Sequence, residues 1–76
     1  MNRRRRSSLK MAARYLDMAI DLIRCAKDEE QDALDNMPEN LQNSEKYDVM
    51  EEVIDVLEEA ISSVDDAKDY IDRAIA

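Results

Sequence analysis

The chain contains no glycine, no histidine and no tryptophan, and only one proline and one cysteine among its 76 residues. Without glycine, the chain cannot form glycine-rich phosphate loops or nucleotide-binding fingerprints. Without histidine and with a single cysteine, it lacks the usual zinc ligand sets and any catalytic triad that depends on histidine. A single cysteine cannot form an internal disulfide, which small secreted domains usually need, so we expect a cytoplasmic protein.

Long hydrophobic runs are also missing from the sequence. No stretch approaches the roughly 20 apolar residues that span a bilayer, and we expect no membrane partner. Residues 1–6 are basic like the start of a signal peptide, but charged residues interrupt the segment that follows. At 76 residues, one small domain is the upper limit.

Charge is abundant and unevenly distributed. Eleven basic and 19 acidic side chains give a net charge of -8; residues 1–27 carry +6 and residues 28–76 carry -14. The four consecutive arginines Arg3, Arg4, Arg5 and Arg6 can attract nucleic acid or a small anion, or can form a solubilising arm. We predict a basic flexible arm over residues 1–7, which an antiparallel hairpin would place beside the acidic end of its second helix.

Apolar residues recur at steps of three and four along two long segments, which is the period of an α-helix. The pattern predicts a first helix over about 8–36, a turn over about 37–43 that contains Pro38, and a second helix over about 44–75. Asn43 or Ser44 is expected to cap the second helix. The sequence therefore predicts an all-α fold, an antiparallel helical hairpin over residues 8–76.

A shared heptad spacing defines the surface along which the two helices should pack. The predicted hairpin core consists of Leu9, Leu16, Ile20, Ile23, Met50, Ile54, Leu57, Ile61, Val64 and Ile71. We call this contact surface between the two helices the seam. Alanines that recur beside these positions are expected to lie in the seam and to let the helices approach closely. The second helix is expected to be one-sided, with its acidic residues facing away from the first helix.

The first helix carries a second apolar stripe opposite its seam. The stripe consists of Met11, Tyr15, Met18, Leu22 and Cys25, at steps of four and three. A two-helix hairpin leaves such a stripe exposed, which monomeric proteins usually avoid. Two interpretations remain open: two hairpins pair along it as a homodimer that forms a four-helix bundle, or the stripe binds a different protein. In both interpretations Cys25 is expected to be a packing residue.

The residues do not point to catalysis. Glu29 with Asp32, and Glu52 with Asp55, have the spacing of helical magnesium sites, but a segment this acidic contains such pairs by chance. A two-helix rod also offers no enclosed cavity that would shift carboxylate pKa values. We therefore predict that the protein is not an enzyme, has no catalytic or metal-binding residues and needs no cofactor.

The segment Asp28 to Glu45, together with Leu16 to Ile20 and Met50 to Ile61, resembles a group of small uncharacterised two-helix proteins from phages and mobile elements of Firmicutes. The likeness covers most of the chain and is most specific around the turn Asn-Met-Pro-Glu-Asn-Leu-Gln. It brings no catalytic residues. The resemblance implies an accessory protein inside a bacterial host cell, where small acidic helical proteins of this origin often inhibit defence systems such as CRISPR effectors.

Three functions are compatible with these features. The first, which we favour, is stoichiometric inhibition of a bacterial host protein, with Glu51, Asp55 and Glu58 competing with nucleic acid for a basic groove. The second is nucleic-acid binding through the four arginines, which the charge of -14 after residue 27 opposes. The third is an oligomer whose arginines surround a small anionic signalling nucleotide.

Overall fold

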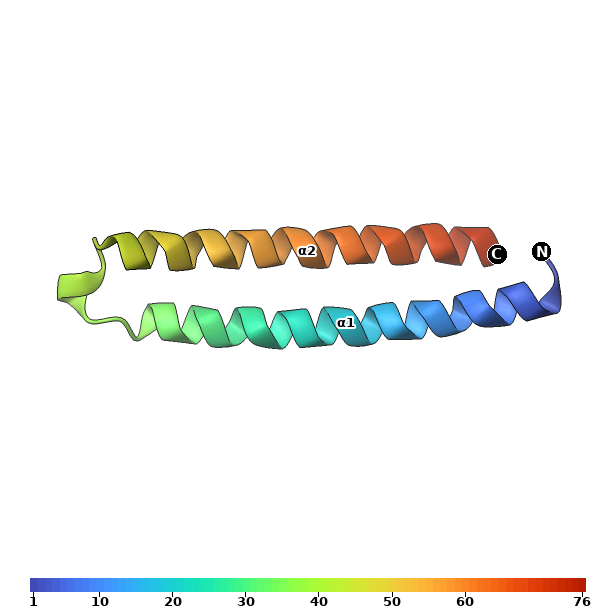
Figure 1. Cartoon of the computed structure of the whole chain (residues 1–76), viewed down its shortest axis with the longest axis horizontal. Helices are drawn as coiled ribbons and strands as arrows, with labels where there is room; N and C mark the ends of the chain where they lie inside the picture. The colour runs from blue at the N-terminus through green and yellow to red at the C-terminus, as the bar shows by residue number, and fades with distance from the viewer.

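The computed structural model describes all 76 residues, as two long α-helices joined by a short turn. Helix α1 spans Arg3–Asp35, the 3-10 helix η1 spans Glu39–Leu41, and helix α2 spans Glu45–Ile75. The two helices lie side by side and antiparallel, with both termini at one end and the turn at the other (Figure 1). The rod measures 60 × 14 × 13 Å. The predicted all-α hairpin is confirmed, and no strand forms.

Helix α1 begins at Arg3, where a flexible arm was predicted as far as residue 7. Asn2 explains the difference, because its Oδ1 accepts a hydrogen bond of 2.8 Å from the backbone N–H of Arg5 and caps the helix. The four arginines therefore form the first turn of α1. They lie at the positive end of the helix dipole, where each charge costs on the order of 0.3–1 kcal/mol at low ionic strength.

The turn follows the predicted residues closely. Asn36 ends α1, and its backbone N–H and its side chain both donate to the carbonyl oxygen of Asp32. Pro38 then holds an extended conformation that cannot continue the helix. Ser44, one of the two expected caps, begins α2 by accepting a 3.3 Å hydrogen bond from the backbone N–H of Tyr47.

A single seam between the helices contains the whole core. Only three residues are buried: Ile20, Leu34 and Ile54, which are 5–7% exposed. The other predicted core residues lie half-buried in the seam, which also includes Tyr47. The alanines differ from expectation: Ala12, Ala19 and Ala60 are half-buried at the seam edge, while Ala26, Ala67 and Ala74 are exposed. The alanines are therefore divided between the edge of the seam and the exposed surface, and the seam itself is thin.

Two ion pairs cross the seam and mark its register. Lys27 Nζ lies 3.7 Å from Glu58 Oε1, and Lys68 Nζ lies 2.7 Å from Asp17 Oδ1. Both lysines occupy seam positions, and their side chains are only 24% and 30% exposed. From Asp17 to Lys27 the chain advances ten residues along α1, and from Lys68 to Glu58 it goes back ten residues along α2. Continuing this register places Ala76 opposite Leu9. The four arginines therefore extend past the end of α2 (Figure 1).

Ile54→Ala should destabilise the hairpin more than any exposed substitution does. Removing the most buried side chain of the seam should lower the free energy of unfolding by roughly 2–5 kcal/mol. Urea unfolding followed by circular dichroism, at one fixed protein concentration, measures the change. Ser62→Ala, on the exposed side of α2, is the control and should change stability by less than about 0.5 kcal/mol. Equal effects of the two substitutions would contradict a core confined to this seam.

Candidate functional site: three surfaces of the hairpin

The face of α1 that points away from α2 carries the predicted stripe, here called the outer stripe. It consists of Met11, Tyr15, Met18, Leu22 and Cys25. The four large side chains are 51–71% exposed, and the Cys25 thiol is free and exposed. The hairpin alone thus leaves all five side chains in water. The packing role expected for Cys25 is against a partner that covers the stripe, so it stays a prediction.

Helix α2 is not one-sided, which corrects the expectation from its sequence. Val49, Val53, Val56 and Tyr70 are 40–65% exposed. They belong to a line of uncharged residues at steps of four and three that runs along nearly the whole helix. We call this line the α2 stripe: Val49, Val53, Val56, Ala60, Ser63, Ala67, Tyr70 and Ala74. The heptad pattern missed it because Val53 and the alanines were assigned to the seam.

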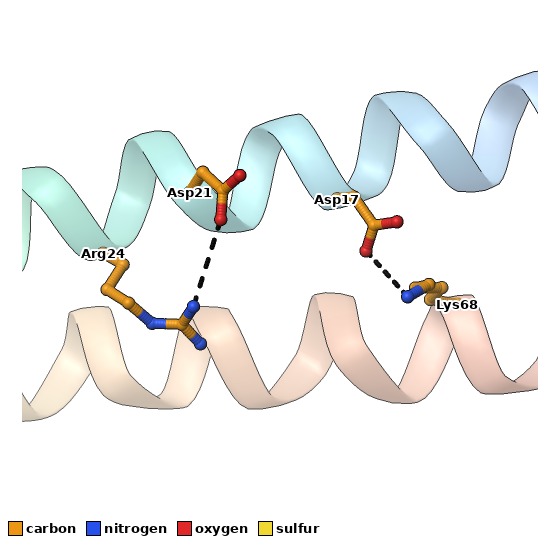
Figure 2. A network of polar contacts seen from close by, with 4 residues as sticks. All are labelled: Asp17, Asp21, Arg24 and Lys68. Carbon is orange, nitrogen blue, oxygen red and sulfur yellow. Dashed lines mark ion pairs between the residues drawn. The ribbon is translucent and has the colours of Figure 1, made fainter.

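The charged residues gather on one flank of the hairpin. Between Ser8 and Ala26, every charged residue of α1 falls on one line at steps of four and three: Lys10, Arg14, Asp17, Asp21 and Arg24. Figure 2 shows part of this line beside α2, with Asp17 paired to Lys68 and Asp21 lying 4.0 Å from Arg24. We call this side the charged flank.

Toward the turn, the charged flank forms a shallow groove of about 270 Å³ between the helices. The predicted acidic face lies here: Glu51, Asp55 and Glu58 line the groove together with Gln31 and Asp35 of α1. This placement corrects the expectation that the three carboxylates face away from α1. Glu58 also pairs with Lys27, which neutralises part of its charge. No group of three or more potential ligand side chains converges closely enough to hold a metal ion.

The opposite side of the hairpin carries few charges. Glu52 lines a shallow hollow there with Val53, Val56 and Leu57, and Glu30 lies one turn on from Ala26. The groove is lined by residues of both α1 and α2, so it marks the same side of the seam on each helix. The residues on the far side of the seam from the groove therefore also form one continuous side of the hairpin. There the α2 stripe lies beside Ala12, Ala19 and Ala26 of α1. We call this surface, the α2 stripe with these three alanines, the uncharged flank.

The basic end of the molecule is held by α1 alone. Arg3, Arg4 and Arg5 are exposed, and none of the four arginines takes part in an ion pair. The register explains this, because the arginines extend past the last residue of α2. The expected contact between the basic segment and the acidic end of α2 is therefore not made.

Comparisons with known proteins add no relative. The chain matches no protein-family model, and searches of curated proteins and of solved structures gave no match. Neither helix is long and apolar enough to cross a membrane.

The contact between Lys68 and Asp17 should make the stability of the hairpin sensitive to alkaline pH. The hydrogen bond from Lys68 to Asp17, together with the charge of that carboxylate, raises the pKa of Lys68 above its ordinary value of 10.5. Charges of Asp72 and Asp65 add to this rise, and partial burial opposes it. A raised lysine pKa gives stability that is fully present below the ordinary pKa and lost as pH rises through the raised one.

The urea midpoint of the wild type should therefore fall further than that of Asp17→Asn between about pH 9 and about pH 11.5. Asp21→Asn is the matched control, because Asp21 lies one turn along the same line but contacts only Arg24 within α1. It should keep the alkaline loss of the wild type. Parallel pH profiles for the wild type and Asp17→Asn would show that this contact does not form in solution.

Proposed function

We propose that this chain is a non-enzymatic binding protein that inhibits a bacterial host protein by stoichiometric contact through the outer stripe. The strongest support is the outer stripe itself. Its five uncharged side chains follow one another along one line of α1, on the side of the helix that α2 leaves exposed. Isolated exposed apolar residues are normal on proteins, but a continuous strip marks a contact surface.

The chemistry of the outer stripe suits a protein groove. Its members are spaced as the anchors of an amphipathic helix that lies in a hydrophobic groove of its target. Methionine adapts its shape to irregular pockets, and Tyr15 joins a large ring to a hydroxyl group that can donate a hydrogen bond. The line from Lys10 to Arg24 runs along one edge of the stripe and would form the polar rim of such an interface.

The charge distribution supports a target that normally binds nucleic acid. Residues 22–63, which form the turn half of the rod, carry three basic and 13 acidic side chains, a net charge of -10. Such a surface would compete with phosphate groups for a basic groove. A nucleic-acid-binding component of a CRISPR-type defence system is therefore the kind of target that we propose.

The homodimer expected from the sequence is part of this proposal. A hairpin with only three buried residues gains little stability from its own core, and small domains of this kind are usually stabilised by association. Exposed apolar residues on both helices give a second copy surface to cover.

Met18→Glu should abolish capture of the target. The wild-type chain, immobilised and exposed to nuclease-treated bacterial lysate, should retain one host protein in a one-to-one ratio of chains. The variant should retain none, because a carboxylate would be buried without a partner in the interface. Ser62→Glu adds the same charge on an exposed position of α2 and should bind like the wild type. Retention that nuclease removes would instead indicate nucleic-acid binding by the arginines.

Replacing Glu51, Asp55 and Glu58 together by lysine tests the role of the acidic groove. If the groove faces a basic surface of the target, the triple variant should bind the captured protein at least tenfold more weakly at low salt. The defect should shrink as salt rises, since screening suppresses exposed charge interactions. A calorimetric titration at two salt concentrations measures it, with helicity checked by circular dichroism. Unchanged binding at low salt would remove the acidic groove from the interface and leave the outer stripe.

A further inference from the structure

We propose that a second copy of this chain covers the uncharged flank, in an antiparallel orientation that brings the turn end of each hairpin beside the terminal end of the other. This inference rests on the proposed homodimer and adds its surface and its direction. It assigns the outer stripe to the host partner and the uncharged flank to self-association.

The angle between the two apolar faces of α2 favours this surface. Each residue of an α-helix is rotated by about 100° about the helix axis relative to the one before it. Applied to the positions of the α2 stripe and of the seam residues of α2, this rotation places the centres of the two faces roughly 100° apart. In a four-helix bundle each helix needs two contact faces about 90° apart, one for each neighbour. The outer stripe lies roughly 150° from the seam of α1, so pairing along it would give a nearly flat row of helices.

Both helices contribute area to the uncharged flank. The α2 stripe extends about 38 Å from Val49 to Ala74, at a rise of about 1.5 Å per residue. At a helix width of about 10 Å the stripe gives roughly 380 Å². The alanines of α1 cover about 21 Å from Ala12 to Ala26 and add roughly 210 Å². Each copy thus contributes roughly 590 Å², about three quarters of the roughly 800 Å² per partner of a standard interface. The alanines at its centre would let the two layers of helices approach closely.

The charges of the two ends select the antiparallel orientation. The turn half of the rod carries -10, while the terminal half, residues 1–21 and 64–76, carries eight basic and six acidic side chains, a net +2. A parallel pair would place two ends of -10 side by side, whereas an antiparallel pair places each beside a basic end. The arginines that extend past α2 would then lie near the partner's turn, where Glu39 and Glu45 are exposed. A twofold axis through the centre of the α2 stripe, between Ala60 and Ser63, gives this arrangement.

Light scattering on the full chain tests the surface. At tens of micromolar the wild type should have twice the mass of one 8.8 kDa chain. Val56→Glu, in the centre of the flank, should have the mass of one chain, and Met18→Glu on the outer stripe should stay dimeric. Both positions are more than half exposed in the hairpin, so neither substitution should unfold it. A dimeric Val56→Glu chain overturns the assignment of the flank, whereas a monomeric wild type overturns the dimer but not the outer-stripe binding.

Engineered cysteines in a Cys25→Ser background test the direction. Ser63→Cys lies next to the proposed twofold axis, so mild oxidation should link the two copies by a disulfide. Val49→Cys lies about 19 Å from the axis, which places the two thiols about 37 Å apart in an antiparallel pair, and it should stay unlinked. In a parallel pair, the thiol at position 49 would lie as close to the same thiol of the second copy as the thiol at position 63 does. Linking through Val49→Cys as efficient as through Ser63→Cys therefore overturns the antiparallel orientation.

Discussion

Two antiparallel helices can pack against each other along only one seam. This limit on how much apolar surface the hairpin buries determines both its small core and its exposed apolar faces. The seam buries three side chains and leaves the remaining apolar residues half-buried or exposed. The rest of the chain is a short turn that contains the 3-10 helix η1, and it leaves the other faces of both helices uncovered. A hairpin with so small a core gains stability when its remaining apolar surface is covered by another protein.

The arrangement of the bare surfaces follows from how the sequence distributes charge around each helix. Between Ser8 and Ala26 the charged side chains of α1 lie on one line. Those of α2 lie on the same side of the seam and on the outer side of α2. The lysines at seam positions extend toward the charged flank, where Asp17 and Glu58 meet them. Each such pair contributes roughly 0–1 kcal/mol, so their main effect is to set the register between the helices. The outer stripe and most of the uncharged flank remain exposed in the hairpin.

The periodicity was sufficient to predict the fold, because a step of three and four over more than thirty residues admits only a helix. It also predicted Ser44 as a cap and the outer stripe, since both depend on local spacing alone. It failed where two patterns compete. Val53, Ala60 and Ala67 fit a seam and a flank equally well on a helical wheel, and only the observed register of the hairpin separates the two.

The start of α1 shows a second limit of the sequence. Four arginines in the first turn of a helix oppose the helix dipole, so their charge favoured an arm. The side chain of Asn2 caps the helix and changes that outcome, although this residue precedes the first apolar position. The sequence also did not predict a specific partner, because an exposed apolar strip favours a contact surface without specifying which surface would match it.

The distance between two turns in solution would test the antiparallel pair most directly. A spin label on Asn43→Cys, in a Cys25→Ser background, reports the separation of the turns by electron–electron dipolar spectroscopy. Residue 43 lies about 28 Å from the centre of the α2 stripe, so an antiparallel pair gives one distance of about 55 Å. A distance below about 30 Å would show a parallel pair, and the absence of any dipolar coupling would show a monomer. Either result would contradict the proposal that a second, reversed copy covers the uncharged flank.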